Sequence, residues 1–245
     1  MANLIIDIGN SRAKAAVMRD GRSVAEYVTT ACSPSWIEEL LALNEDVCQA
    51  IISSTGIATK AIYEFLVSRL DYVVDFSPAT TPLPIGNDYL TPATLGADRI
   101  AAAVGAWRLY PDNDILIVDF GTAITVDYVV DGRFKGGNIS LGMTTRFRAL
   151  SDYTARLPLC SATEDVLAYG RTTCEAIEQG VMQGITHEIE GYISAFSQEK
   201  SKICTIFTGG DAKYFVKRIK NAIFADCEPV ICGLNTILEY NAKRR

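Results

Sequence analysis

The 245-residue sequence has too little of several residue types for the commonest catalytic and metal sites. It contains one histidine, His187, and this excludes multi-histidine metal centres and HExxH helices. The helical pattern around His187 predicts a buried structural residue. The GxxxxGK[ST] loop and the GxGxxG fingerprint of standard nucleotide sites are also absent. Any chemistry must therefore come from carboxylates, hydroxyls, lysines or bound ions.

Long apolar runs and closely spaced cysteines are missing as well. No segment approaches the roughly 18 consecutive apolar residues of a membrane span, and the N-terminus lacks the basic region of a signal peptide. An odd number of scattered cysteines without a CxxC pair is typical of buried free thiols in a reducing compartment. We therefore expect a cytoplasmic protein with no membrane partner. The seven cysteines are Cys32, Cys48, Cys160, Cys174, Cys204, Cys227 and Cys232.

Positive charge is in deficit. The chain has 23 Lys and Arg against 29 Asp and Glu, which gives a net charge of −6. Because binding to nucleic-acid phosphates needs a basic face, we expect no nucleic-acid partner. With 49% hydrophobic and 21% charged residues, the composition is that of a globular protein.

One strand-and-turn pattern occurs twice. The apolar run 4–9 ends in Asp7-Ile8-Gly9, and the run 115–122 contains Asp119-Phe120-Gly121. A second apolar segment follows each run and ends at an Asp-Gly turn, which is typical of a β-hairpin. The same order at nearly the same spacing indicates a duplicated α/β unit. We predict two domains, residues 1–114 and 115–245.

The rest of the sequence alternates between helical and strand patterns. A Ser-Pro pair at 33–34 predicts a helix start, and a capping-box spacing at 161–164 predicts another. The predicted helices cover 33–43, 60–70, 96–110, 144–156 and 172–196, a short helix begins at 161–164, and a strand leads into a helix within 229–242. Strands are predicted at 50–54, 72–76 and 204–207, with a proline-rich loop over 78–92.

Three glycine-containing turns follow apolar strands, at 7–11, 119–125 and 208–212. Glycine lets the backbone approach an anion closely, and exposed N–H groups at such turns bind phosphate oxygens. A carboxylate at a strand end can hold Mg²⁺, and Lys14 can supply positive charge to a phosphate. A single Asp-x-Gly is most often only a tight turn, but three such turns together favour a nucleotide site.

The order of these motifs resembles that of a known family. The chain is similar to the acetate and sugar kinase, Hsp70 and actin superfamily, and within it to the type III pantothenate kinases. Leu141 departs from the proline that this family usually has before the glycine of its Gly-Gly-x-Ile-x-Pro-Gly element. The motifs that carry the resemblance are Asp7-x-Gly9-Asn10-Ser11-x-x-Lys14, Gly96-Ala97-Asp98-Arg99, Asp119-x-Gly121-Thr122-Ala123-x-Thr125-x-Asp127, Gly136-Gly137 with Gly142, and Thr208-Gly209-Gly210-Asp211-Ala212.

The resemblance implies the fold and the activity. The fold class would be α/β, with duplicated ribonuclease H-like (actin-like ATPase) domains, each a mixed sheet flanked by helices, and a cleft between them. The reaction would be transfer of the γ-phosphoryl group of ATP to the primary hydroxyl of pantothenate. Its product, 4'-phosphopantothenate, begins coenzyme A biosynthesis. The resemblance also implies a homodimer, Mg²⁺, and a monovalent cation, K⁺ or NH₄⁺.

The resemblance further implies roles for individual residues. Asp98 would be the catalytic base and Arg99 would bind the pantothenate carboxylate. Asp119 would bind the monovalent cation, and Asp7 would bind Mg²⁺, directly or through water. The other expected ATP contacts are Asp7, Gly9, Asn10, Ser11, Lys14, Thr122, Gly209 and Gly210, and the other substrate contacts are Tyr89, Gly96, Ala97, Asp98 and Thr173.

The residue patterns leave alternatives open. Asp98 could be only a first-turn acid that the helix dipole stabilises. Tyr89 could be a packed loop aromatic, Thr173 a helix N-terminal hydroxyl, and Asp119 a second Mg²⁺-side acid. At the level of the whole chain, the alternatives are a nucleotide-sensing regulator without turnover and another small-molecule kinase of the superfamily. The retained Gly-x-Asp-Arg element and Lys14 favour an enzyme.

Overall fold

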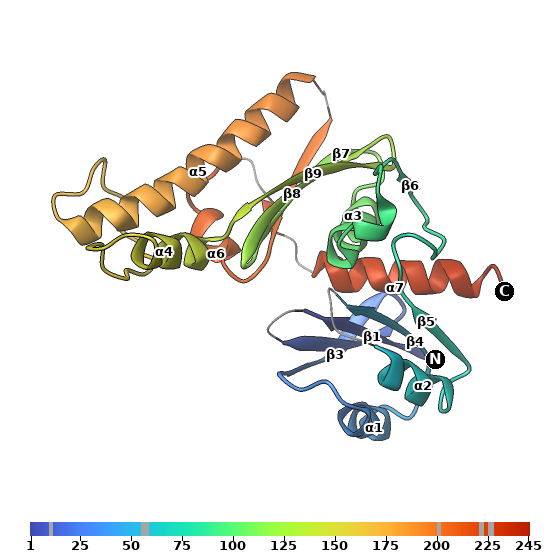
Figure 1. The fold of residues 1–245 in the computed structure, drawn as a ribbon. Helices are drawn as coiled ribbons and strands as arrows, with labels where there is room; N and C mark the ends of the chain where they lie inside the picture. The colour runs from blue at the N-terminus through green and yellow to red at the C-terminus, as the bar shows by residue number, and fades with distance from the viewer. Residues whose placement is uncertain (10–11, 55–58, 200–201, 221–222, 225–227) are drawn as a thin grey trace. The chain divides into compact units, whose positions relative to one another are not determined.

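The computed structural model of the chain describes residues 1–9, 12–54, 59–199, 202–220, 223–224 and 228–245 (Figure 1). The chain forms two compact units, which are described separately. Unit 1 comprises Met1–Pro111, Gly132–Phe134 and Cys227–Arg245, and unit 2 comprises Asp112–Asp131 and Lys135–Asp226. The C-terminal segment therefore belongs to the same unit as the N-terminal strands. The division of the repeat at residue 114 stays a prediction.

Unit 1 contains a five-stranded mixed sheet with the order β3-β2-β1-β4-β5. The first three strands are antiparallel neighbours, whereas β4 and β5 are added in parallel beside β1. The parallel connection requires a crossover, which the first helix supplies. The strands are β1 (Ala2–Ile8), β2 (Ala13–Arg19), β3 (Arg22–Thr29), β4 (Val47–Ser54) and β5 (Tyr72–Asp75).

Helices pack on this sheet because its central strands have apolar side chains on both faces. Leu4 and Ile6 of β1 share a core with Ile37 and Leu66 from the two helices that follow β3 and β4. The C-terminal helix packs against β1 and β4, and Asn3 of β1 donates a hydrogen bond to it. The helices of unit 1 are α1 (Pro34–Leu43), α2 (Lys60–Val67), α3 (Ala97–Leu109) and α7 (Pro229–Ala242), with a 3-10 turn at Pro92–Thr94.

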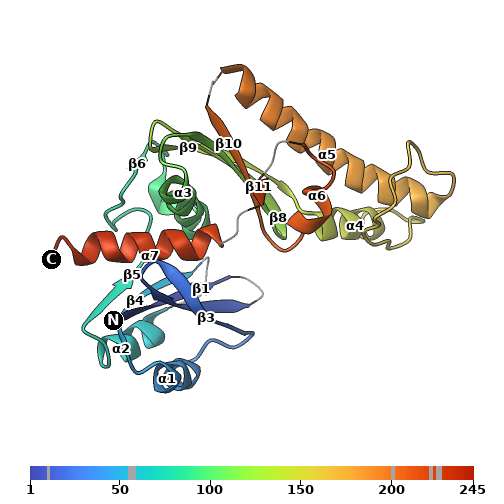
Figure 2. The ribbon, with the colours of Figure 1, turned by 180° about the vertical axis from the view of Figure 1, so that it is seen from behind.

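Unit 2 repeats the same strand order. Its sheet runs β9-β8-β7-β10-β11, with β7 antiparallel to β8 and parallel to β10. Phe120 of β7 stacks on Phe215 at 4.8 Å between ring centroids, and both belong to a core to which α5 also contributes. Figure 2 shows α5 as a long helix beside the sheet of unit 2. The elements are β7 (Asp114–Phe120), β8 (Ala123–Val130), β9 (Arg133–Leu141), α4 (Met143–Asp152), α5 (Thr173–Glu199), β10 (Ile203–Thr208), α6 (Ala212–Phe215) and β11 (Ile223–Phe224).

The two hairpin turns have the same backbone conformation. Asp20 and Gly21 have φ of 49° and 75°, and Asp131 and Gly132 have φ of 52° and 67°. Two successive positive φ values define a type I′ turn, which matches the right-handed twist of the flanking strands. The predicted hairpins are therefore confirmed, and so is the repeated order of the opening strands.

The predicted helix at 161–164 is wrong. The segment between α4 and α5 has no helix, although its capping-box spacing is present. The Thr163 hydroxyl instead accepts the Asp165 N–H at 3.1 Å in a local turn. Side chains outside the segment donate hydrogen bonds to its carbonyl groups. Arg218 donates to the Thr163 carbonyl, and Gln179 donates to the Asp165 carbonyl. These tertiary partners satisfy backbone groups that a helix would otherwise have paired.

Four further expectations need correction. The predicted strand before the last helix does not exist, because Pro229 is already the first residue of α7. His187 lies on α5 as predicted, but its side chain is exposed rather than buried. Of the six described cysteines, which are all free thiols, only Cys204 is buried, and Cys227 lies outside the described residues. The proline-rich loop contains a short strand, β6 (Gly86–Asn87), that pairs with the start of β9.

No helix in the described part of the chain combines the length and the apolar character needed to cross a bilayer.

Candidate active site

The first glycine turn joins β1 and β2 in unit 1. Asp7 and Lys14 are directly opposite each other in the antiparallel register, so their side chains lie on the same face of the hairpin. The Gly9 N–H donates to the Arg12 carbonyl at 3.1 Å and closes the turn. Asn10 and Ser11 lie outside the described residues. The hairpin therefore places a half-buried carboxylate beside a cationic side chain.

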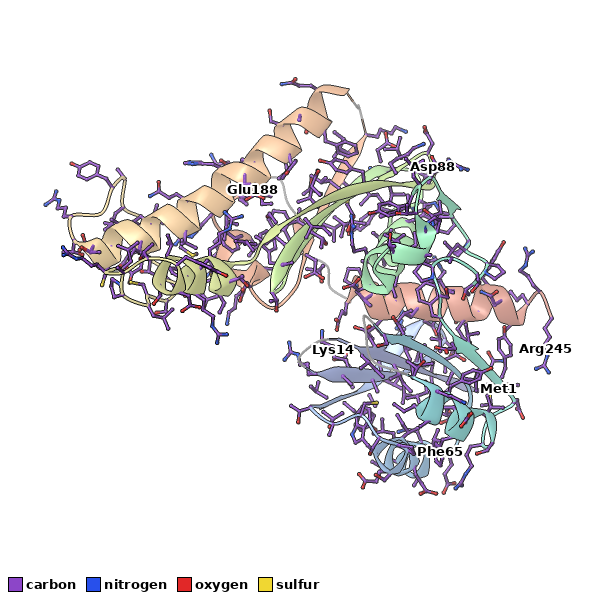
Figure 3. The ribbon with its side chains drawn as sticks, viewed as in Figure 1. Met1, Lys14, Phe65, Asp88, Glu188 and Arg245 are labelled. Atoms are coloured by element: carbon purple, nitrogen blue, oxygen red, sulfur yellow. The ribbon has the colours of Figure 1, made fainter. Side chains whose placement is uncertain are left out.

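Lys14 has a partner that the sequence analysis missed. Its ammonium forms an ion pair with Glu228, the residue immediately before α7 (Figure 3 labels Lys14). Glu228 is 214 residues away in sequence, and no local pattern connects the two. A phosphate group that bound Lys14 would replace the Glu228 carboxylate as its partner. The Lys14 ammonium is thus already oriented by a negatively charged group.

The second glycine turn joins β7 and β8 in unit 2. The Gly121 N–H donates to the Ala123 carbonyl at 3.2 Å, and Thr122 is exposed at the tip. The Thr122 carbonyl accepts the Gly142 N–H at 3.0 Å and the Thr145 hydroxyl at 2.7 Å. A Cβ atom on Gly142 would lie 2.1 Å from the Gly121 carbonyl oxygen, so only glycine fits there. The start of α4 therefore fixes this turn.

The third glycine turn packs directly against the second. Asp119 of β7 is in register with Thr208 of β10, and the Asp211 N–H donates to the Phe120 carbonyl at 3.1 Å. Gly209 has φ of 94°, and a Cβ there would lie 2.4 Å from Oδ1 of Asp119. The structure thus brings Asp119, Thr122 and the Gly209-Gly210 pair to one end of the sheet, where backbone N–H groups can bind phosphate.

Two other acids of unit 2 are less suited to chemistry. Asp127 is 1% exposed, and a Cβ on Gly137 would lie 2.4 Å from its Oδ1. Burial raises the pKa of the Asp211 carboxyl, an effect that Lys213 opposes. Both acids therefore fit structural roles.

Asp98 and Arg99 lie in the first turn of α3, in unit 1. Gly96 precedes the helix, and a Cβ there would be 2.5 Å from Oδ1 of Asp98. That same oxygen accepts the Arg99 N–H at 2.9 Å. The Asp98 carboxylate is therefore half-buried and oriented by the backbone, a position that the helix dipole also stabilises. It has the exposure and the fixed geometry that a proton acceptor needs.

Arg99 is buried, with 6% of its surface exposed. Its guanidinium carbon lies 5.8 Å from the ring centre of Tyr89 and 6.0 Å from that of Phe134, within the range of cation–π attraction. The two rings are 6.1 Å apart. The structure therefore brings together Tyr89 and Arg99, which the resemblance implies as separate substrate contacts, and adds Phe134, which sequence reasoning missed.

An ion pair holds Tyr89 in this position. Asp88 (labelled in Figure 3) accepts hydrogen bonds from Arg133 at 3.0 and 3.1 Å, in addition to a short contact. This pair joins the loop before Tyr89 to the residue before Phe134. The Asp131-Gly132-Arg133 sequence predicts only a hairpin turn, so the ion pair of Arg133 with Asp88 could not be inferred from the sequence.

Thr173, the remaining predicted substrate contact, lies in unit 2. It is the first residue of α5 and lines a groove of about 750 Å³ between α4 and α5. The groove is mostly apolar, and Arg146 crosses it to reach Glu188 of α5 (labelled in Figure 3). The same Arg146 donates to the Leu141 carbonyl at 2.8 Å. This bond holds the chain where the related family usually has proline.

Comparisons with known proteins point to one family. A family profile described as type III pantothenate kinase matches residues 3–195. A type III pantothenate kinase from Phocaeicola vulgatus is 40% identical over 98% of this chain and 99% of its own, and one from Bacteroides fragilis is 41% identical over 99% of both.

Solved structures of lower identity share the fold. A Baf family protein from Campylobacter jejuni superposes with a TM-score of 0.64 at 23% identity, over 98% of this chain and 99% of that one. A ROK family protein from Streptococcus pneumoniae superposes with a TM-score of 0.54 at 12% identity, over 100% of both chains. The fold class predicted from the sequence, two mixed sheets flanked by helices, is confirmed.

Proposed function

Because the chain belongs to the type III pantothenate kinase family, we propose that it transfers the γ-phosphoryl group of ATP to the primary hydroxyl of pantothenate. ATP is the co-substrate and 4'-phosphopantothenate the product, which makes the protein an enzyme of coenzyme A biosynthesis. The observation that carries the proposal is the first turn of α3, where the oriented Asp98 carboxylate adjoins the buried Arg99.

The acceptor side of the mechanism uses this helix start. The hydroxyl of pantothenate must lose a proton as its oxygen attacks the γ-phosphorus, and Asp98 takes that proton. Arg99 binds the pantothenate carboxylate, for which a guanidinium fork is well shaped. Tyr89 supports Arg99 through its ring, and Gly96 and Ala97 bring the backbone close to the substrate.

The nucleotide side uses the three glycine turns. In unit 1, the backbone at Gly9, the residues Asn10 and Ser11, and the Lys14 ammonium bind phosphate oxygens. In unit 2, Thr122 and the Gly209-Gly210 backbone do the same. Backbone N–H donors at strand ends stabilise the charge that spreads over the transferring phosphoryl group.

Bound cations would neutralise the remaining negative charge of the phosphate groups. The described residues contain no cluster of three His, Cys, Asp or Glu side chains that could hold a metal alone. A single carboxylate with water and phosphate oxygens is how Mg²⁺ commonly binds beside nucleotides, and Asp7 fits this arrangement. Asp119, at the glycine-lined strand end, would hold K⁺ or NH₄⁺. When bound, these ions supply positive charge against the phosphates.

We also propose that the chain acts as a cytoplasmic homodimer. Unit 2 exposes large apolar side chains near the α4–α5 groove, among them Tyr153 at 88% and Leu141 at 51% exposure. An apolar face of this kind is typical of a surface that a partner covers. Thr173 lines the same groove, which would place this substrate contact near the dimer interface.

The Asp98→Asn variant tests the catalytic base. It keeps the size of the side chain but removes its basicity, so pantothenate-dependent ADP release should fall by roughly 100-fold or more. Nucleotide binding, measured by calorimetry with ADP, should stay near that of the natural protein. Asp112→Asn, at an exposed acid of the loop before β7, is the matched control and should keep full activity. Full activity in Asp98→Asn would contradict the assignment.

A coupled assay tests the function itself. ADP release is measured with ATP and Mg²⁺, with and without pantothenate, and in the presence or absence of K⁺. Turnover only when pantothenate is present is the expected result. Nucleotide binding without any pantothenate-dependent turnover would instead support the nucleotide-sensing regulator.

A further inference from the structure

Two backbone hydrogen bonds tie the segment before α3 to the start of β9, within unit 1. The two-residue strand β6 pairs in parallel with the first residues of β9. The Gly86 N–H donates to the Gly132 carbonyl at 3.0 Å, and the Asp88 N–H donates to the Phe134 carbonyl at 2.9 Å. A segment with so few backbone bonds opens easily, so side-chain contacts decide how firmly it is held.

The Arg133 side chain supplies such a contact by crossing β6 to reach Asp88. Its Nε atom donates to the two carboxylate oxygens at 3.0 and 3.1 Å, and its Nη2 atom adds a short contact. Glycine at position 86 makes room for it, because a Cβ there would lie 2.5 Å from Nη1 and 2.8 Å from Cγ of Arg133. The side chain therefore fastens β6 to β9 from outside the backbone ladder.

Each partner of this ion pair is followed by an aromatic residue that lies beside Arg99. Tyr89 follows Asp88, and Phe134, which is fully buried, follows Arg133. The guanidinium carbon of Arg99 is 5.8 and 6.0 Å from the two ring centres. Because the rings come from the two segments that the ion pair joins, the pair fixes the distance between them and the space left for the guanidinium.

We propose that Arg133 is a positioning residue for pantothenate. Its ion pair with Asp88 keeps the two rings in place, and the rings keep the Arg99 guanidinium in one orientation for the carboxylate of the substrate. The proposal rests on the proposed function, in which Arg99 binds that carboxylate. An ion pair as exposed as this one adds little to folding stability, so its effect is on local order. A binding group that is already ordered loses less conformational entropy when the ligand binds.

The Arg133→Met variant tests the effect on the substrate. Methionine removes the charge and the donors but keeps an unbranched side chain, so the KM for pantothenate should rise about three- to tenfold as Arg99 loses its fixed orientation. The KM for ATP and kcat should stay unchanged, whereas general damage to the unit would alter all three. Asp88→Asn removes the other charge of the pair and should have the same effect. No rise in the KM for pantothenate in either variant would overturn the proposal.

Arg19→Met is the matched control. Arg19 forms an exposed, two-point ion pair of the same kind with Asp46, at 2.7 Å for both bonds, but this pair joins β2 to the residue before β4. The variant should leave kcat and both KM values unchanged. A rise in the KM for pantothenate equal to that of Arg133→Met would show a general effect of losing an exposed ion pair, and would contradict the positioning role.

A double variant tests whether Arg133 acts through Arg99. In the Arg99→Lys background the guanidinium that the rings orient is already gone, so adding Arg133→Met should raise the KM for pantothenate no further. Two residues that act independently would instead multiply their effects on KM. Multiplied effects would therefore overturn the proposed route through Arg99.

Hydrogen–deuterium exchange tests the positioning without reference to turnover. In the full-length protein, peptides covering residues 85–89 should exchange faster in Arg133→Met and in Asp88→Asn than in the natural protein, and Arg19→Met should match the natural protein. Unchanged exchange in both ion-pair variants would overturn the proposal. If the natural protein shows no pantothenate-dependent turnover, the proposed function fails, while the exchange rates still decide whether Arg133 orders this segment.

Discussion

At the scale of single residues, the molecule places its charged groups where other groups already orient them. Arg99 lies beside two aromatic rings, Asp98 accepts a backbone N–H, and Lys14 forms an ion pair with Glu228. A side chain that is already ordered loses less conformational entropy when a ligand binds. The two cationic groups, Arg99 and Lys14, are therefore already ordered for the anionic ligands of the proposed reaction, in a protein whose net charge is −6.

The Arg99→Lys variant tests the shape of this group as well as its charge. Lysine keeps the positive charge but has no planar guanidinium that could form a bidentate fork or stack on an aromatic ring. We expect the KM for pantothenate to rise about tenfold, equivalent to about 1.4 kcal/mol, while the KM for ATP stays unchanged. Steady-state kinetics with each substrate varied would measure both values.

Arg108→Lys is the matched control, because Arg108 is exposed in the last turn of the same helix. It should leave both KM values unchanged. An equal rise in the KM for ATP in Arg99→Lys would show general damage to the unit, and would contradict a specific contact with pantothenate.

At the scale of elements, two glycines let helices α3 and α7 approach closely. A Cβ on Gly105 would lie 2.0 Å from the Pro229 carbonyl oxygen, and one on Gly233 would lie 1.8 Å from that of Ala101. Only hydrogen atoms fit at these crossings. Because Asp98 and Arg99 lie in the first turn of α3 and α7 follows Glu228, this close packing sets where three site residues of unit 1 lie.

The Gly105→Ala variant tests the crossing. Its methyl group must push α7 away from α3, so the free energy of unfolding should fall by about 1–3 kcal/mol, as in other overpacked cores. Urea denaturation followed by circular dichroism would measure this change. Gly191→Ala on α5 is the control: its added Cβ meets nothing within 4 Å, so it should be neutral or stabilise the helix by up to about 1 kcal/mol. Equal stability of both variants would contradict the packing argument.

At the scale of the whole molecule, the overall charge opposes the ligands. A chain with net charge −6 gives no general positive field to attract ATP and pantothenate, which are both anions. Local groups must therefore neutralise them, namely the glycine turns, Lys14, Arg99 and bound cations. The same reasoning makes cation dependence a physical expectation for this enzyme.

Replacing K⁺ with Na⁺ at constant ionic strength tests this expectation. A site that selects the larger ion should give several-fold faster ADP release with KCl than with NaCl, with both substrates saturating. Asp119→Asn removes the carboxylate proposed to hold the ion, so it should lower the rate in KCl and abolish the difference between the salts. Equal rates in both salts for the natural protein would remove the monovalent cation from the proposal.

Local patterns were sufficient wherever neighbouring residues decide the structure. The Asp-Gly turns predicted the two hairpins because a type I′ turn needs two positive φ values, which Asp and Gly tolerate together. Ser33 predicted the start of α1, and its hydroxyl does accept the Trp36 N–H. The capping-box spacing at 161–164 gave a wrong prediction because Arg218 and Gln179, distant in sequence, donate hydrogen bonds to the carbonyl groups of that segment.

The order and spacing of the motifs were thus enough to predict the repeat, because it depends on contacts between near neighbours and on residue types at strand ends. The resemblance of the same motifs to a known family implied the fold class. The surroundings of the candidate site residues came only from the folded chain. Phe134 beside Arg99, Glu228 beside Lys14 and Gly142 beneath Thr122 are brought together by strand pairing and helix packing across long stretches of sequence. Such contacts leave no periodic signal, since each needs only one residue of the right size or charge at one position.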